Sequence, residues 1–153
     1  MEFYNLGNNI IAFTTDRNQG RDMNSIREAV IKQQPSLSGT LAKGIYPHQT
    51  HTDRVFHITE EFLALPEHEQ KESLEGIDAV ISDARNVILG ISTADCIPVL
   101  VYDPEHHAAA AIHAGWKGTV KRIVKKAVQE MTTTFHTDTS RCIAAIGPGI
   151  SLD

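Results

Sequence analysis

The hydrophobic positions of this chain include two long apolar runs, and each run is interrupted by side chains that carry chemistry. Residues 87–102 are interrupted by Asp95 and Cys96, and residues 108–114 by His113. Apolar runs of this length indicate strands that are buried on both faces. A polar group in such a strand needs a hydrogen-bond partner, a metal or a reaction to offset its burial. The pattern therefore predicts two strands that bring a thiol and an imidazole together.

Shorter apolar segments predict the remaining strands, because they are rich in residues that favour extended backbone. We expect strands over residues 10–15, 41–46, 54–59, 76–83, 87–90 and 142–146. Pro98 has no amide hydrogen to donate to a neighbouring strand. The strand that holds Cys96 is therefore expected to end or bulge just after that residue.

Helical spacing governs the stretch that follows Gly118, where apolar residues recur every three or four positions with basic residues between them. The apolar face comprises Val120, Ile123, Val124, Ala127, Val128 and Met131, and the basic face comprises Lys121, Arg122, Lys125 and Lys126. Gly118 or Thr119 is expected to cap this helix.

Two earlier segments also have helical character. Residues 22–33 carry apolar side chains at helical spacing, with Asp22 or Asn24 near the cap. Residues 60–75 are acidic and contain Pro66, which predicts a surface excursion with one or two helical turns.

The length of 153 residues predicts a single domain, over residues 1–153, with a full hydrophobic core. The last predicted strand is followed by Gly147-Pro148-Gly149, and a turn of this kind usually leads into further structure. Only a few residues follow it here. Two interpretations remain open: the sequence is cut short at its C-terminus, or the domain is unusually minimal.

Composition narrows the class of protein. A net charge of −5 argues against a general nucleic-acid binder, which would carry a basic face. Two cysteines far apart in the sequence give no disulfide framework, so we expect a reducing compartment, the cytoplasm. The N-terminus does not read as a signal peptide, and no apolar stretch approaches the roughly 20 residues that cross a bilayer. We therefore expect neither nucleic acid nor membrane as a partner, and the oligomeric state stays open.

Three side chains are candidates for one site: His51, Cys96 and His113. Zinc accepts thiolate and imidazole together, and a catalytic zinc site uses three protein ligands with one position open. Copper also accepts this set of donors. Two other interpretations stand beside the metal site, because Cys96 also fits a small buried hydrophobic side chain and His113 a hydrogen-bonded core histidine.

The turn that follows His113 has features of an anion site. Gly115 and Gly118 flank Trp116 and Lys117 at a predicted helix N-terminus, where free amides and the helix dipole favour negative charge. The alternative is a simple turn from strand to helix. Asp95 is a candidate general acid or base if burial raises its pKa, or else an acceptor for backbone amides at a turn.

The other cysteine and most other histidines have less specific surroundings. Cys142 is expected in the core. Five histidines are expected at the surface: His48, His57, His106, His107 and His136.

Five segments of the chain together resemble one known family. They read Q-T-H-T-D-R-V, G-I-D-A-V-I-S-D, S-T-A-D-C-I-P-V-L-V-Y-D-P, A-A-I-H-A-G-W-K-G-T and A-A-I-G-P-G-I-S, in this order. In them the chain is similar to the YfiH-type family, also called the laccase-domain, polyphenol oxidase, multicopper polyphenol oxidoreductase or peptidoglycan editing factor family. The resemblance covers residues 49–151 well and the first 45 residues poorly.

The resemblance implies an α+β fold of mixed α/β type, with β-sheets packed together and helices on the outside. It implies a metal, usually zinc, held by the histidine of Q-x-H, the cysteine of A-D-C and the histidine of H-A-G-W. These are His51, Cys96 and His113 here. It also implies purine nucleoside phosphorylase activity on adenosine, inosine and methylthioadenosine, with adenosine deaminase activity. The partners would be a purine nucleoside and phosphate.

For phosphorolysis we assign catalytic roles to Asp95, Cys96 and Lys117, and substrate contacts to the Q-x-H and G-W-K-G segments. The substrate-binding set is Gln49, Gly115, Trp116, Lys117 and Gly118. The chain departs from the family at Lys117, where arginine is commoner, and in the altered N-terminal segment T-T-D-R-N-Q-G-R-D-M-N.

Other functions remain as alternatives. A copper-dependent polyphenol oxidase would need several coppers, for which one His–Cys–His set is too small. A metal-free hydrolase would use Cys96 as nucleophile and His113 as base. The chain also fits a non-catalytic remnant of an enzyme.

Overall fold

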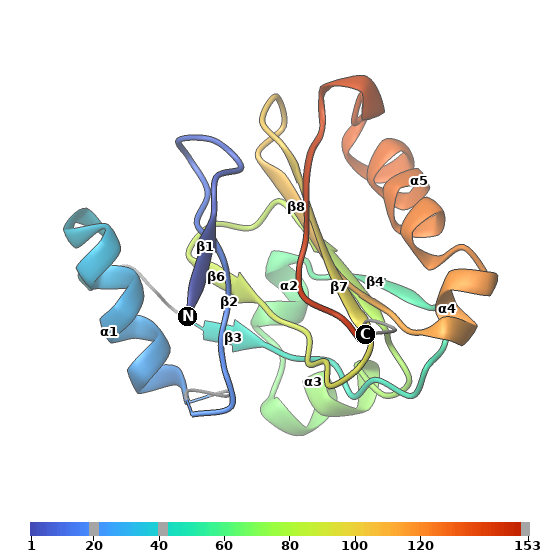
Figure 1. Ribbon diagram of the computed structural model, residues 1–153, viewed down its shortest axis with the longest axis horizontal. Helices are drawn as coiled ribbons and strands as arrows, with labels where there is room; N and C mark the ends of the chain where they lie inside the picture. Colours follow the sequence, from blue (N-terminus) through green and yellow to red (C-terminus); the bar gives the residue numbers. More distant parts are fainter. Residues whose placement is uncertain (19–21, 40–42, 151–153) are drawn as a thin grey trace.

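The computed structural model describes residues 1–18, 22–39 and 43–150. Its centre is a five-stranded sheet of order β4-β5-β8-β7-β9 (Figure 1). These strands are β4 (Val55–His57), β5 (Ala79–Ser82), β8 (Ala108–Ala114), β7 (Ile97–Asp103) and β9 (Ile143–Ile146). β4 and β5 are parallel, and every other neighbouring pair in this sheet is antiparallel.

Two smaller strand pairs and the helices complete the fold. The antiparallel pair is β1 (Glu2–Tyr4) with β2 (Ala12–Thr14), and the parallel pair is β3 (Lys43–Ile45) with β6 (Val87–Leu89). The α-helices are α1 (Met23–Gln33), α2 (Glu60–Leu63), α3 (Glu67–Ser73), α4 (Trp116–Val120) and α5 (Ile123–Phe135). Two 3₁₀ turns are η1 (Pro35–Leu37) and η2 (Thr139–Arg141). The predicted α+β class is confirmed, since helices lie outside the sheets (Figure 1).

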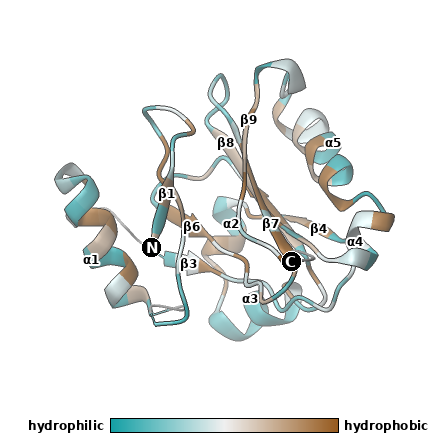
Figure 2. Cartoon of the chain, in the orientation of Figure 1, coloured by the Kyte–Doolittle hydropathy of each residue, from teal (hydrophilic) through white to brown (hydrophobic). Residues whose placement is uncertain are grey.

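β8 shows why a continuous apolar run forms the central strand. Its even-numbered residues, such as Ile112, pack with α5 in one core cluster. Its odd-numbered residues face the opposite side, where Ala111 packs with Phe62 and Ile77. Because side chains alternate along a strand, His113 lies on the face opposite α5. Figure 2 shows hydrophobic colouring along the strands and on parts of α5, with α3 largely hydrophilic.

The predicted helix over residues 120–131 is interrupted at its start. α4 ends at Val120, and Arg122 takes a left-handed backbone, φ 60°, as the N-cap of α5. The expected cap at Gly118 or Thr119 is therefore wrong, because Gly115 precedes α4 and Arg122 precedes α5. The break leaves Val120 73 % exposed, whereas the other five apolar residues of the predicted face are buried or half-buried.

Pro98 lies inside β7, so the expectation that the strand ends or bulges after Cys96 is wrong. The strand instead begins at Ile97. Gly147 donates its amide hydrogen to the carbonyl oxygen of Pro98 at 2.9 Å, beyond the end of β9. Pro98 is tolerated because it lies near the start of β7. Its missing N–H falls opposite Gly147, which lies beyond the end of β9. Consequently Asp95 and Cys96 lie in the loop before β7, not within a buried strand.

The other predicted segments have mixed outcomes. Asp22 caps α1 as expected, since its carboxylate accepts from the amides of Asn24 and Ser25. The first residues of the strand predicted over 41–46 lie outside the described part, and β3 is seen from Lys43. The acidic segment over 60–75 forms two helices, but it is not purely a surface excursion, because Phe62 and Leu74 are buried.

Among the described residues no helix is long and apolar enough to span a bilayer.

Candidate metal centre

The three predicted ligands come together at one end of the central sheet. One donor atom from each of His51, Cys96 and His113 lies within 4.8 Å of the other two. His51 is exposed in the loop after β3, Cys96 is half-buried before β7, and His113 is 4 % exposed near the end of β8. The rings of the two histidines meet edge to face, with centroids 5.1 Å apart.

Asp78, directly before β5, organises this cluster and was not predicted from the sequence. Its side chain is fully buried. Its carboxylate accepts hydrogen bonds from three successive backbone amides, those of Thr50 and Thr52 on Oδ1 and that of His51 on Oδ2, at 3.0–3.1 Å. The hydroxyl of Thr52 donates to Oδ1 as well. Asp78 therefore holds the backbone that carries His51.

The same carboxylate also holds His113. Nδ1 of His113 lies 2.6 Å from Oδ2 of Asp78 and donates to it. This bond leaves Nε2 as the free nitrogen of His113, which is the arrangement that metal-binding histidines usually show. Burial raises the pKa of Asp78, but the hydrogen bonds from His113, Thr52 and Thr50 outweigh burial and bring the pKa below its usual value.

His51 takes a left-handed backbone conformation with φ 65°. A non-glycine residue seldom adopts this conformation without support from its surroundings. Here the support comes from Asp78, which binds the amides on both sides of His51 as well as its own. The turn thus presents the imidazole toward the other two candidate ligands.

Gly115 provides the room that the cluster needs. A Cβ atom at this position would lie 3.2 Å from Sγ of Cys96 and 3.2 Å from Cδ2 of His51. The φ of Gly115 is −75°, which any residue adopts, so the glycine is required by space and not by backbone conformation. A mixed sulfur and nitrogen donor set with space at its centre fits zinc, and it also fits copper.

Gln49 is engaged by the protein itself. Its Nε2 donates to the carbonyl oxygen of Ser92 at 2.6 Å, and its Oε1 accepts from the amide of Ser92 at 2.7 Å. These two bonds tie the loop that leads to Cys96 to the loop that carries His51. The contacts that the structure gives Gln49 are therefore positioning contacts.

The remaining predicted site residues lie beside the cluster. Trp116 and Lys117 are exposed on α4, and Nζ of Lys117 lies 5.8 Å from the centroid of the Trp116 ring. Gly118 is buried inside α4, where a Cβ atom would meet Thr52 and the side chain of Ile123. Asp95 is exposed, so the burial on which its acid–base role depended is absent.

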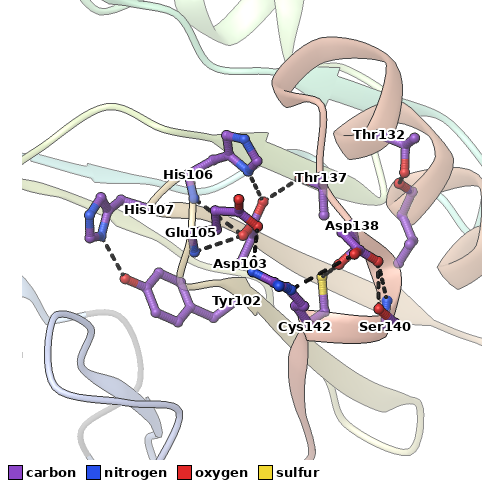
Figure 3. Close-up of polar contacts among 12 residues, drawn as sticks. Tyr102, Asp103, Glu105, His106, His107, Thr132, Thr137, Asp138, Ser140 and Cys142 are labelled. Atoms are coloured by element: carbon purple, nitrogen blue, oxygen red, sulfur yellow. Dashed lines mark hydrogen bonds and ion pairs between the residues drawn. The ribbon is translucent and has the colours of Figure 1, made fainter.

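A second buried carboxylate lies away from this cluster, at the end of β7. Asp103 is 1 % exposed and accepts from the hydroxyl of Thr137 at 2.7 Å and from Nδ1 of His106 at 2.8 Å (Figure 3). Burial raises the pKa of Asp103, but these hydrogen bonds, together with those from the amides of His106 and Glu105, lower it further than burial raises it. His107 bonds the hydroxyl of Tyr102 at 3.1 Å.

These contacts correct part of the surface prediction for the histidines. His106 and His107 are half-buried, and so is His57, whose ring meets that of Phe135 edge to face. His48 and His136 are exposed as expected. Cys142 is half-buried and packs against the α5 core, and burial is the main cause that raises the pKa of its thiol.

Fold and cluster together define an α+β protein with a buried carboxylate behind a His–Cys–His set, the one group of this kind among the described residues. Residues 11–153 match the family described as "Multi-copper polyphenol oxidoreductase laccase". The chain belongs to this family, and the resemblance drawn from its motifs is confirmed.

Relatives with assigned names match most of this chain. It is 38 % identical over 144 residues to "Purine nucleoside phosphorylase" of Bacteroides thetaiotaomicron, which covers 94 % of this chain and 53 % of the relative. It is 39 % identical over 134 residues to "Adenosine deaminase RL5" of an unknown prokaryotic organism, covering 88 % and 51 %. The chain thus spans about half the length of these relatives.

Solved structures show the same fold. YlmD from Geobacillus stearothermophilus is similar with a TM-score of 0.63 and 26 % identity, over 78 % of this chain and 44 % of that one. A YfiH protein from Bacillus licheniformis is similar with a TM-score of 0.63 and 27 % identity, over 80 % and 48 %.

Proposed function

We propose that this chain carries a zinc-dependent purine nucleoside phosphorylase site, with adenosine deamination as a second reaction at the same place. The observation that carries the proposal is the His51–Cys96–His113 cluster with its Asp78 support. The relatives named for the two reactions match this chain over 94 % and 88 % of its length. Purine nucleosides, including adenosine, inosine and methylthioadenosine, are the substrates we expect.

Zinc is proposed before copper because the family resemblance implies zinc, and a catalytic zinc site uses three protein ligands with one position open. When bound, such an ion supplies Lewis-acid polarisation and lowers the pKa of a water. His51, Cys96 and His113 would hold the ion. Asp78 keeps the proton on Nδ1 of His113, and Gly115 keeps the space beside Cys96 clear.

The residues beside the cluster suit a small anionic co-substrate and a flat base. Phosphorolysis forms a bond between a phosphate oxygen and C1′ of the ribose, breaks the bond from C1′ to the base, and leaves a proton on the base. Lys117 is exposed next to Gly115 and can donate to phosphate, while Trp116 offers an exposed aromatic face. We keep Asp95, at an exposed position in the loop before β7, as a proposed general acid or base.

The test is adenosine phosphorolysis measured against phosphate concentration, with adenine and inosine quantified separately. Lys117→Ala should raise the KM for phosphate severalfold at unchanged zinc content. Lys117→Arg should keep or improve phosphate use, because the guanidinium can bind an oxyanion with two hydrogen bonds. Lys125→Ala serves as the matched control, since Lys125 is an exposed lysine on α5.

Identical phosphate curves for the parent and both Lys117 variants would remove Lys117 from the site. Inosine release without adenine release would leave deamination as the reaction. No turnover of adenosine by the zinc-loaded, folded protein would contradict the proposal for this chain.

A metal-free thiol hydrolase is a second candidate, because one specific arrangement favours it. Cys96, His113 and Asp78 follow the order of nucleophile, base and orienting carboxylate, with Asp78 bonded to Nδ1 of His113. Ester or amide hydrolysis that persists after thorough chelation, and that is lost in Cys96→Ser, would support this candidate over the zinc enzyme.

The copper-dependent phenol oxidase named in the family description needs a different test. Only one cluster of candidate ligands occurs in the part of the chain that the structure describes, whereas multicopper chemistry uses several coppers. Oxygen consumption with phenols after copper loading, at a rate that exceeds free copper, would favour this reaction.

A further inference from the structure

One face of the central sheet is covered incompletely at its middle. On the α5 face of β7, Val99 and Val101 are 7 % and 4 % exposed. Leu100 lies between them, on the opposite face, and is only half-buried although β7 has a neighbouring strand on each side. Ala109 of β8 shares the face of Leu100 and is also half-buried, whereas Ala110 on the α5 face is 3 % exposed. The face opposite α5 therefore borders an accessible space at the centre of the sheet.

That space is a cavity of about 820 Å³, lined by this face of the sheet, by β1, β2 and the loop between them, and by α1. Protein interiors hold few voids larger than a water molecule, whereas sites for small molecules have volumes of roughly 300–1,000 Å³. α1 contributes Ile26 and Val30, which are buried but belong to none of the hydrophobic clusters in the described part of the chain. Half-buried apolar side chains form much of the wall: Ile10, Phe13, Leu37, Ile88, Leu89 and Leu100. The size and the apolar wall fit an organic ligand.

One end of the cavity has a cation without a partner. Arg85, in the turn after β5, is exposed and lines the cavity, and its side chain makes no ion pair or hydrogen bond within residues 1–18, 22–39 and 43–150. Tyr102 lies near it, because burial raises the pKa of this phenol and the charge of Arg85 offsets part of the rise. The phenol oxygen bonds Nδ1 of His107, which also lines the cavity. Asp16, the one carboxylate among the described lining residues, lies 3.6 Å from the N-terminal ammonium. The Arg85 end therefore favours an anionic group.

The cavity extends along β7, since Pro98, Leu100 and Tyr102 alternate onto one face and all line it. Pro98 and Tyr102 are four residues apart, which is about 13 Å along a strand and about the length of an extended ten-carbon chain. We propose that the cavity binds an elongated aliphatic carboxylate, with its carboxylate at Arg85 and its chain over Leu100 and Ala109. None of the three candidate metal ligands is among the lining residues, so this site is separate from the metal centre and does not rest on the proposed reaction.

The test is calorimetric titration of the chain with decanoate, octanoate and the uncharged decanol, with and without added zinc. We expect one decanoate per chain. Each buried methylene should raise the affinity about fourfold, so decanoate should bind roughly 15-fold more tightly than octanoate. Zinc should leave the affinity for decanoate unchanged, because the carboxylate lies at Arg85 and not at the metal centre. Amide hydrogen exchange at Ile26 and Val30 should slow on binding, since α1 covers the cavity.

Variants locate the two ends of the ligand. Arg85→Gln should weaken decanoate binding at least tenfold and leave decanol binding unchanged, because it removes a charge that only the acid uses. Arg17→Gln is the matched control, since Arg17 is also an exposed arginine in the cavity wall, and it should change neither affinity. Val30→Phe and Ala109→Leu fill the cavity from α1 and from the sheet. Each should weaken both ligands at least tenfold, and either variant that folds gives the result.

The proposal is overturned if the folded parent binds no decanoate at millimolar concentration, if a folded filling variant binds it as tightly as the parent, or if binding requires zinc. An equal loss of decanol binding in Arg85→Gln, or a loss of decanoate binding in Arg17→Gln alone, would contradict the position assigned to the carboxylate. None of these measurements involves turnover of a nucleoside, so failure here leaves the proposed reaction untouched.

Discussion

Replacement of Asp78 by asparagine tests whether one buried carboxylate organises the site. An asparagine has a single side-chain oxygen where Asp78 uses two. In the better orientation this oxygen still accepts from Thr50 and Thr52, but the amide NH₂ then faces the backbone N–H of His51 and Nδ1–H of His113. Two donors lose their acceptor, and the opposite orientation leaves three donors facing the NH₂ group.

The magnitude follows from these two donors. An unsatisfied buried donor costs about 1–3 kcal/mol, so Asp78→Asn should lower the free energy of unfolding by about 2–6 kcal/mol. His113 can recover one bond by moving its proton to Nε2, but that tautomer cannot offer Nε2 to a metal. Loss of a carboxylate behind a metal-binding histidine typically weakens binding about 10- to 100-fold. We therefore expect zinc affinity to fall within that range.

The assays are urea unfolding and zinc competition against a chromophoric chelator, both at neutral pH. Asp103→Asn is the matched control, because Asp103 is equally buried, accepts from a histidine and a threonine, and belongs to the separate contacts shown in Figure 3. It should lose comparable stability and keep its zinc affinity. If folded Asp78→Asn binds zinc as tightly as the parent, or if Asp103→Asn weakens zinc binding equally, the argument for Asp78 is refuted.

Two further predictions concern the metal and pH. Purified protein should hold about one zinc per chain, and Cys96→Ser should lose it while Cys142→Ser keeps it, as measured by elemental analysis; full occupancy in the Cys96 variant would contradict the site. Because the pKa of Asp103 is lower in the folded protein than in the unfolded chain, its stabilisation is present above about pH 4 and lost as pH falls through the folded value. The stability difference between the parent and Asp103→Asn should therefore shrink from pH 6 to pH 3, and a constant difference would show that the carboxylate is not responsible.

Local patterns were sufficient for the central elements. The apolar run of β8 reflects burial on both faces of the strand, and the amphipathic spacing of α5 reflects one apolar face; in each case neighbouring residues determine the pattern. The motifs around His51, Cys96 and His113 also indicated a shared site before the fold was known. These features were predictable because each depends on a short stretch of sequence.

The missed features depend on contacts between distant segments. Pro98 was expected to stop a strand, but only the pairing with Gly147 shows that its missing amide lies beyond the end of β9. The left-handed backbone conformation of Arg122 separates α4 from α5. It could not be predicted, because no glycine marks this position in the sequence. Asp78 lies at the start of an apolar strand, where a buried carboxylate needs partners just as His113 does, but its partners come from a distant loop.

The graded exposure of the three candidate ligands determines the order in which an ion can meet them. His51 lies at the surface, Cys96 is half-buried and His113 is buried. An ion bound here from solvent would therefore meet the exposed His51 before the buried His113. Exchange of the ion with a chelator would proceed from the same side.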